Sequence, residues 1–301
     1  MKKVFLKFFG GAMLIVLIAS SCKKTTDVAL PPIGGFNNSG EVGKSDLIAY
    51  WPLNGDGNES ISGTTPSKTL AVTFETGVKG KGATFNSGYM DYPSIPALVI
   101  ADGSISISCW AKITNTKASE GAVSTISPLL SFSGGPNKNV GNLSLFGNTH
   151  GLVTSDSIQL KGEFHFKKSD GTEFGGDCIN MIKKESWMDS THTWNANKIG
   201  GVWAHVVYVY DGTNAKNRLY VNGVKISNSA WESRNGGLPL PMSFFTPSRP
   251  IIGALATVVD GTNADTWNAA LKGSVDEIRV WKKALAAAEI DALYQLEKAG
   301  R

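Results

Sequence analysis

Short runs of alternating apolar and polar residues make up most of the chain from about residue 46 onward. Alternation with a period of two is typical of β-strands that bury one face. The runs are LIAYWPL (47–53), TLAVTF (69–74), SISISCWAKI (104–113), IQLKGEFHF (158–166), VWAHVVYVYD (202–211) and GSVDEIRVW (273–281). Glycines (34) and prolines (12) punctuate the chain between such runs. The pattern predicts one large all-β domain.

Helical periodicity is convincing only near the C-terminus, in LAAAEIDALYQL (285–296). There Leu285, Ile290, Leu293 and Leu296 can share one stripe of a helix. The sequence therefore predicts one short C-terminal helix.

The stretch WAHVVYVYDGTNAKNRLYVNGVKI (203–226) predicts three strands folded back on each other. Asn222-Gly223 is a strong hairpin signal, because both central positions of a two-residue turn favour positive φ. Along the first strand, from Trp203 to Tyr210, both faces are largely apolar or aromatic. Such a strand is central and covered on both sides, which a two-sheet sandwich explains and a single open sheet does not.

The first residues, MKKVFLKFFGGAMLIVLIASSC, have a basic start and a short apolar run, which is the layout of an export signal. The end of this stretch resembles a lipobox, so residues 1–21 are expected to be a signal peptide and Cys22 the lipidated first residue. The alternative is a plain secretory signal with a chance cysteine. Residues 22–45 are rich in Gly, Pro, Asn and Ser and predict a flexible tether. The folded domain is then 46–301, anchored by lipid in a bacterial envelope, at the periplasmic or surface face of the outer membrane.

Charge excludes one class of partner. Removal of residues 1–21 lowers Lys+Arg from 29 to 26 against 25 Asp+Glu, so the formal charge falls from +4 to +1. A nucleic-acid partner therefore has no support. Cys109 and Cys178 remain, and we expect two free thiols, although an oxidising envelope would permit a bridge.

Five segments occur in an order that resembles the laminin-G-like, concanavalin A-like jelly rolls of bacterial surface lipoproteins. They are YWPLNGDGNES, GKGATFNSGYMDYP, SISISCWAKI, WAHVVYVYDG followed by RLYVNG, and GSVDEIRVWKKALAAAEIDALY. The resemblance implies an all-β fold, a two-sheet antiparallel jelly-roll sandwich with adjacent first and last strands. It also implies a short last helix beside the final strand. It does not imply one function.

Catalytic motifs are missing from the sequence. Glycanases on this fold carry carboxylates in the pattern E-x-D-x-x-E, so that acid and nucleophile flank one bond. Asp276 and Glu277 are adjacent and would point to opposite faces of a strand, and Glu163 stands alone. The four histidines have no zinc-type spacing. No reaction can be assigned, and His205 is expected to be a hydrogen-bonded strand histidine.

A glycine-rich turn, NGDGNE (54–59), is a candidate metal site. Asn54, Asp56 and Glu59 offer oxygen ligands of the kind calcium accepts. The alternative is a turn that needs no ion. The resemblance implies a structural calcium where this turn meets the acidic start of the final strand, at Asp276.

Four tryptophans fall in loop-like segments, at positions 187, 194, 231 and 267. An exposed indole face suits the apolar face of a sugar ring. WMDSTHTWN adds polar groups, so we expect Trp187, Asp189, His192 and Trp194 to bind a ligand. This segment lies between Gly134 and Gly201, a region longer than the family minimum, and such insertions often carry binding function. The alternative is that these loops bury their own tryptophans.

These observations favour a non-catalytic carbohydrate-binding envelope lipoprotein, accessory to polysaccharide capture, whose only membrane contact is the lipid anchor. Two alternatives stay open: a glycoside hydrolase or lyase with an unrecognised site, and an adhesion module that binds a protein partner. Two close carboxylates in a cleft would favour the enzyme, and a groove with a flat tryptophan face would favour the lectin.

Overall fold

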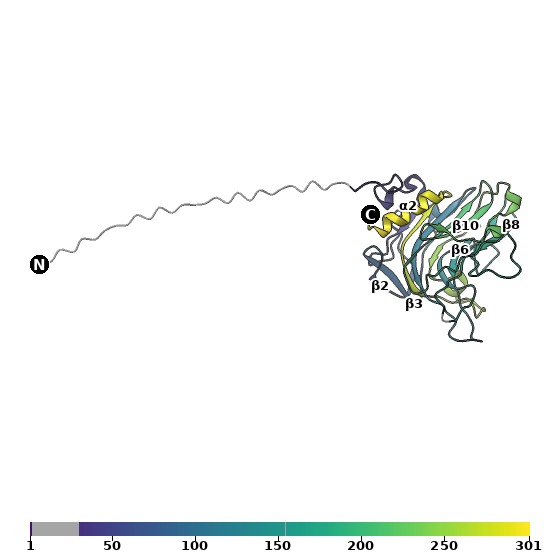
Figure 1. The fold of residues 1–301 in the computed structure, drawn as a ribbon, viewed down its shortest axis with the longest axis horizontal. Helices are drawn as coiled ribbons and strands as arrows, with labels where there is room; N and C mark the ends of the chain where they lie inside the picture. The colour runs from purple at the N-terminus through teal and green to yellow at the C-terminus, as the bar shows by residue number, and fades with distance from the viewer. Residues whose placement is uncertain (2–29, 154) are drawn as a thin grey trace. The chain divides into compact units, whose positions relative to one another are not determined.

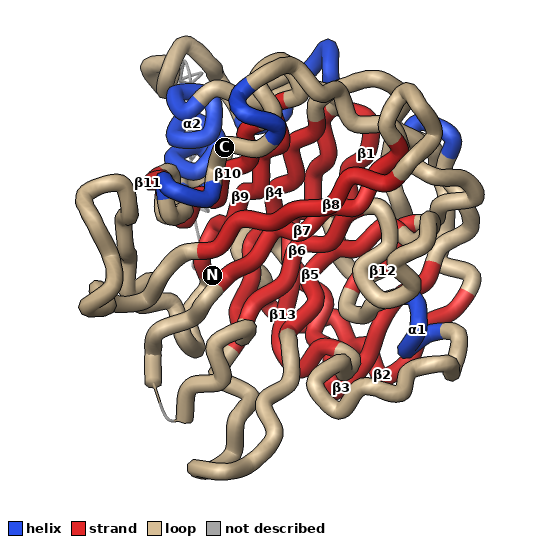
Figure 2. Tube along the Cα trace, turned by 90° about the vertical axis from the view of Figure 1, so that its right-hand side faces the viewer, coloured by secondary structure: helices blue, strands red, loops and turns tan. Residues whose placement is uncertain are grey.

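The computed structural model describes residue 1 and residues 30–153 and 155–301 (Figure 1). Its compact unit begins at Pro32. Within these residues, antiparallel strands form one 13-stranded sheet that curls into two layers (Figure 2). The predicted all-β jelly-roll fold is confirmed.

The first layer contains the first and last strands of the chain, which are neighbours as the resemblance implies. It comprises β1 (Leu47–Trp51), β2 (Lys68–Thr76), β3 (Lys81–Asp91), β4 (Ile105–Ile113), β9 (Ala204–Asp211), β10 (Lys216–Val221), β11 (Val224–Lys225) and β13 (Leu271–Trp281). The predicted hairpin turn is confirmed, because Asn222 and Gly223 have φ values of 49° and 80°.

The second layer comprises β12 (Pro250–Ile252), β5 (Ser127–Phe132), β6 (Leu143–Gly147), β7 (Leu160–Lys167) and β8 (Glu173–Ile179). Strand β12 pairs with both β3 and β5, so the ladder runs continuously from one layer into the other. Two α-helices, α1 (Ala256–Val259) and α2 (Ala287–Lys298), are accompanied by 3₁₀ turns. These turns are Ser39–Glu41, Lys44–Asp46, Pro96–Leu98, Ser229–Trp231 and Asn235–Gly237.

The core lies between the layers, where β7 faces β9. The rings of Phe164 and Tyr210 are 4.9 Å apart in an edge-to-face contact. Gly162 lets the layers approach, because a Cβ at this position would lie 2.1 Å from the ring of Tyr208. Cys109 and Cys178 are free and buried in the same core, as predicted.

The outer face of the first layer is covered by α2. Val207 and Val209 of β9 pack there against the predicted apolar stripe of the helix. Leu285, Ile290, Leu293 and Leu296 are all buried. Strand β9 is therefore covered on both faces, as predicted, by the core on one side and by a helix on the other.

Residues 32–45 of the expected tether at 22–45 lie within the compact unit that begins before the expected domain start at 46, and residues 22–29 lie outside the described part of the chain. Residues from Pro32 onward belong to the compact unit. Val42 is 1% exposed and packs in the α2 cluster, where Ile33 and Phe36 join it. Its carbonyl accepts a hydrogen bond from Trp281 Nε1 at 3.1 Å. Burial of these apolar side chains stabilises the segment against the domain, although its composition, rich in turn-forming residues, favours a linker. No helix among the described residues is long and apolar enough to cross a membrane.

A buried group of charges lies beneath α2. Glu297 of the helix pairs with Arg279 of β13 and accepts a hydrogen bond from Trp110 Nε1 at 2.7 Å. His205 lies beside it, with Nε2 3.7 Å from Glu297 Oε2, and neither ring nitrogen has a hydrogen-bond partner among the described residues. The expectation of a hydrogen-bonded His205 is therefore wrong. Burial, together with Arg279, lowers the pKa of His205 to about 3.

Candidate functional site

Strand β7 carries a row of charged residues on the outer face of the second layer. Leu160, Phe164 and Phe166 point into the core, so the alternate residues Lys161 and Glu163 face outward. Lys161 Nζ lies 2.7 Å from Glu163 Oε2 and 3.0 Å from Oδ2 of Asp177, on the neighbouring strand β8. Arg234 in turn pairs with Asp177 at 2.9 Å.

His165 continues this row. Its Nε2 lies 3.2 Å from Glu163 Oε1, and its Nδ1 lies 2.6 Å from Glu173 Oε1. Asn137 Nδ2 is 3.0 Å from the same Nε2. The hydrogen bond to Glu163 raises the pKa of His165, and the one to Glu173 adds to this effect against the opposing effect of burial.

A cavity of about 410 Å³ opens on this polar face. Its lining comprises Ser124, Ile126, Asn137, Asn139, Val140, Phe146, Asn148, Thr149, Lys161, Glu163 and Trp267. Trp267 is 37% exposed, whereas Phe146 is buried at 3%. The cavity thus combines an accessible indole with amide, ammonium and carboxylate groups, the composition expected of a small polar ligand site.

The loop that carries Trp267 is held by a network of side-chain hydrogen bonds. Asn139 donates to Asp265 at 2.7 Å and accepts from Thr257 at 2.7 Å. Asn268 donates to the same Asn139 oxygen at 3.3 Å. The carbonyl of Trp267 itself accepts a hydrogen bond from the backbone of Ile126 at 2.9 Å. The backbone that carries the indole is therefore fixed before any ligand arrives.

The electrostatics of this face weigh against acid catalysis. Burial acts to raise the pKa of Glu163, but hydrogen bonds from His165 and Lys161 outweigh it, and the pKa lies below its ordinary value. A glycosidase general acid needs the opposite shift. The carboxylates of Glu163 and Asp177 both form ion pairs with the ammonium group of Lys161.

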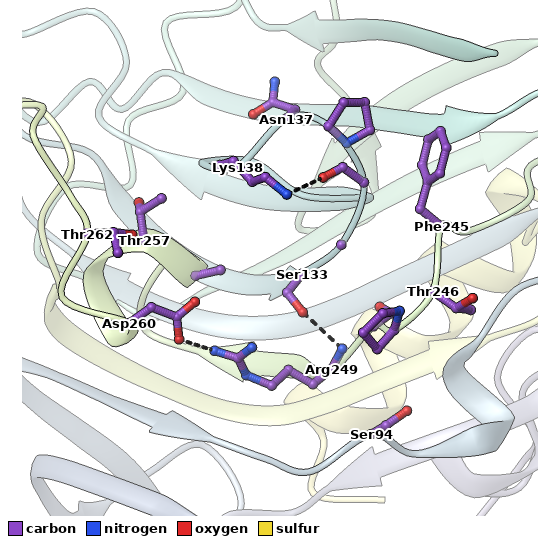
Figure 3. A pocket seen from close by; sticks show the side chains of 16 residues that line it. Ser94, Ser133, Asn137, Lys138, Phe245, Thr246, Arg249, Thr257, Asp260 and Thr262 are labelled. Atoms are coloured by element: carbon purple, nitrogen blue, oxygen red, sulfur yellow. Dashed lines mark hydrogen bonds and ion pairs between the residues drawn. The ribbon is translucent and has the colours of Figure 1, made fainter.

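A second cavity, of about 870 Å³, lies between residues 133–138, residues 245–249 and the segment that contains α1 (Figure 3). Its guanidinium group, Arg249, is already paired with Asp91 at 2.6 Å and Asp260 at 2.7 Å. Figure 3 also shows Lys138 hydrogen-bonded to the carbonyl of Gly135. This larger cavity has no tryptophan in its lining. The smaller cavity is the better candidate because it presents an indole.

The structure brings together three of the four residues predicted to bind a ligand. The Trp187 and His192 rings meet edge to face, 5.1 Å apart. His192 Nδ1 lies 2.9 Å from Asp189 Oδ1. Trp194 is 53% exposed but has no ring contact within the described part of the chain. Trp231, one of the four candidate loop tryptophans, joins the group by stacking on Trp187.

In the structure, the residues expected to bind calcium accept hydrogen bonds from nearby protein groups. Glu59 is fully buried, and its oxygens accept hydrogen bonds from the backbone of Tyr50, Ile61 and Ser62 at 2.6–2.9 Å. The hydroxyl of Ser62 adds another at 2.5 Å. Four donors thus surround the Glu59 carboxylate, where a cation would need free lone pairs.

The other three expected ligands bind backbone amides as well. Asp276 accepts from the amides of Val78 and Lys79 at 2.8 and 3.1 Å, and Asn54 accepts from Lys81 at 2.9 Å. Asp56 caps its own turn at the amide of residue 58. These bonds fit a turn that needs no ion, with Glu59 the least suited to a cation. Calcium binding stays a prediction, and Cys22 lies outside the described residues.

Sequence reasoning named Trp267 among four candidate loop tryptophans but did not predict the polar residues of the smaller cavity. The alternation of Lys161, Glu163 and His165 in IQLKGEFHF was a usable signal, because three polar residues two positions apart share one face of a strand. The partners of this row, Asp177 and Asn137, come from other segments and cannot be found by spacing.

The fold and its polar outer face place the protein among the antiparallel jelly-roll sandwiches. A family model described as the concanavalin A-like lectin/glucanases superfamily matches residues 86–291. This is more than half of the chain, so the protein belongs to that superfamily. No curated protein sequence matches the chain.

Solved structures agree with this fold. The binding domain of Paraclostridial Mosquitocidal Protein 1 aligns with a TM-score of 0.54 at 14% identity, over 84% of this chain and 52% of that chain. The binding domain of botulinum neurotoxin serotype G gives 0.52 at 13%, over 83% and 51%. The serotype D ligand-binding domain, in complex with N-acetylneuraminic acid, gives 0.51 at 11%, over 85% and 52%. This chain spans about half the length of these domains, and the likeness shows the fold alone.

Proposed function

We propose that this protein is a non-catalytic glycan-binding module that takes a sugar into the Trp267 cavity. The proposal rests on the partly exposed Trp267 indole, which is held in a fixed position in the cavity beside Lys161, Glu163 and several amide side chains. An indole stacks on the apolar face of a sugar ring, and the amides and charges around it can bind hydroxyl groups. The bound N-acetylneuraminic acid in the serotype D neurotoxin domain supports sugar binding on this fold.

The charge of the cavity favours a neutral glycan. Its cation, Lys161, is already shared by Glu163 and Asp177, and Arg234 is paired with Asp177. An acidic sugar would meet no free cation and would approach two carboxylates. Neutral hydroxyl groups, in contrast, can donate to these carboxylates without breaking an ion pair. Together with the export signal and Cys22, this supports an envelope lipoprotein that captures polysaccharide.

The test is binding of the 23–301 fragment to an array of neutral and acidic oligosaccharides, followed by calorimetry on the sugars that bind. We expect neutral sugars to bind. Trp267→Ala should weaken their binding by about 2 kcal/mol or more, the loss typical of a central aromatic anchor.

Leu238→Ala is the matched control, since Leu238 is 66% exposed and does not line the cavity. This variant should bind as the parent does. If Trp267→Ala folds and binds sugar as the parent does, the sugar-binding site lies outside this cavity. A parent that binds no sugar on the array would remove the proposed function.

A further inference from the structure

A second aromatic surface lies outside the Trp267 cavity and is formed by Trp187, His192 and Trp231. The two indoles are nearly parallel, with ring centroids 6.2 Å apart and an interplanar angle of 23°. The His192 ring stands edge-on to both, at 88° to Trp187 and 87° to Trp231. These three side chains are called the aromatic platform below.

Trp187 packs near Trp231 but stays accessible. The two ring centroids are 6.2 Å apart, and Trp187 is 55% exposed. The accessible part of this indole is called its open face below. A tryptophan that only plugged the core would be buried, and a large exposed apolar side chain in a fixed position is typical of a binding surface.

The platform is rigid without a ligand. Asp189 Oδ1 accepts hydrogen bonds from the amide and hydroxyl of Thr191, at 2.8 and 2.6 Å, and also contacts His192 Nδ1. Thr193 bonds to Asn228 at 3.1 Å, which ties this loop to the one that carries Trp231. A prearranged surface loses little conformational freedom when it binds.

The platform also offers a hydrogen-bonding edge. Within the described residues, the contacts of the Asp189 carboxylate all end on Oδ1. Its Oδ2 is left to accept from a ligand. The hydrogen bonds from Thr191, with that from His192, lower the pKa of Asp189 to about 2, so the group is a carboxylate at neutral pH. Hydroxyl groups suit this acceptor, whereas acidic groups would be repelled.

The sheet connects the Lys161 side of the cavity to the loop that carries Trp231. Lys161 of the cavity pairs with Ile179 on β8, and the Ile179 carbonyl accepts a hydrogen bond from the amide of Asn228. Two strand-like spacings, on the order of 10 Å, therefore separate Lys161 from the loop that carries Trp231. A polysaccharide several sugars long can extend over that distance.

We propose that the aromatic platform is a second contact for neutral polysaccharide, in which a sugar ring stacks on the open face of Trp187 and donates a hydroxyl to Asp189. The identity of the ligand rests on the proposed function, but the site is separate from the Trp267 cavity. A short oligosaccharide fills the cavity alone, whereas a longer chain reaches the platform as well and gains affinity by multivalency.

The experiment uses arabinan, xylan and mannan, and their trisaccharides, with the 23–301 fragment. Affinity gel electrophoresis measures polymer binding, and calorimetry measures trisaccharide binding. Trp187→Ala should weaken polymer binding by roughly tenfold and leave trisaccharide binding unchanged. Trp187→Phe should retain part of the polymer affinity. Leu238→Ala is the control, because Leu238 is 66% exposed and lies outside the platform. It should bind as the parent does.

The outcomes separate the two sites. Loss of polymer binding in Trp187→Ala but not in Leu238→Ala supports the platform, even if Trp267→Ala has no effect and the cavity fails. Loss only in Trp267→Ala supports the cavity and overturns the platform. Equal losses in Trp187→Ala and Leu238→Ala overturn it as well, and so does an early thermal melt of Trp187→Ala with normal polymer binding. A parent that binds none of these polymers removes both proposals for neutral polysaccharide.

Discussion

His165 and Glu59 show how single polar side chains hold the loops around the candidate site and the first strand. His165 uses both ring nitrogens, which contact Glu163 and Glu173 on the polar face of β7 and β8. Glu59 is fully buried and organises the turn after β1 by accepting backbone hydrogen bonds. Both residues are ionisable, so their contributions to stability can be measured directly.

The raised pKa of His165 predicts a pH dependence of stability. Folding favours the protonated ring, so this contribution is complete below the unfolded pKa of about 6.5 and is lost as pH rises through the folded pKa. Between about pH 6 and pH 9, the melting temperature of the parent should fall relative to that of His165→Gln. Melts of both proteins across this range provide the measurement. Parallel curves would contradict the prediction.

Glu59→Ala should destabilise the domain with or without calcium. The substitution leaves buried N–H groups without an acceptor, which costs about 3 kcal/mol or more for several such groups. Urea denaturation in EDTA and in added calcium gives the comparison. A calcium ligand would behave differently, because the variant would then lose stability mainly in calcium. Calcium that raises the stability of the parent but not of Glu59→Ala would support the metal site and contradict the hydrogen-bonded turn.

At the scale of elements, α2 and the segment 32–45 act together on the outer face of the first layer. The helix buries its apolar stripe on Val207 and Val209, and Val42 fills the space beside Trp281. A helix of this length depends on such packing more than on its own propensity. The N-terminal segment is therefore part of the domain and extends the apolar cluster that holds the helix.

A fragment that starts at residue 46 should be less stable than one that starts at residue 32. The deletion removes buried Val42 and leaves the Trp281 indole N–H without its acceptor. Loss of one buried side chain and one hydrogen bond costs about 2–4 kcal/mol. Chemical denaturation of both fragments measures the difference. Val42→Ala in the longer fragment should reproduce part of this loss of stability. If the two fragments are equally stable, the domain boundary lies at residue 46 as first expected.

At the scale of the whole molecule, the two layers carry different surfaces. The outer face of the first layer is covered by α2 and the segment 32–45. The outer face of the second layer carries the Lys161–Glu163 row and the Trp267 cavity. The chain therefore enters the domain on one layer and presents its candidate site on the other. An anchor at Cys22 would therefore not require residues 32–45 to cover the cavity.

Cys22→Ser should release the protein from membranes without changing its glycan binding. The prediction rests on the N-terminal sequence MKKVFLKFFGGAMLIVLIASSC, in which basic residues are followed by an apolar run and then by small residues. Membrane fractionation of cells that express the parent or the variant tests it. If the Cys22→Ser variant fractionates with membranes as the parent does, the lipid anchor is wrong.

Local patterns in the sequence determined the type of the main elements. The period-two runs became β1, β2, β4, β7, β9 and β13, and the single helical stripe became α2. Asn222-Gly223 formed the predicted turn. These features follow from steric rules and burial within a few residues, so spacing alone reveals them. The loop positions of Trp187, Trp194 and Trp267 were predicted from local sequence, whereas their exposure was left open and is shown only by the structure.

The tertiary structure decided which residues meet. Asp177 reaches Lys161 only because β8 pairs with β7, and Trp267 reaches the same cavity through a loop held by Asn139. Val42 is buried because α2, at the other end of the chain, lies beside it. The same effect brings the Asp276 carboxylate to the amides of Val78 and Lys79. These contacts join segments far apart in sequence, and their energies depend on distance and burial, which a one-dimensional pattern does not contain.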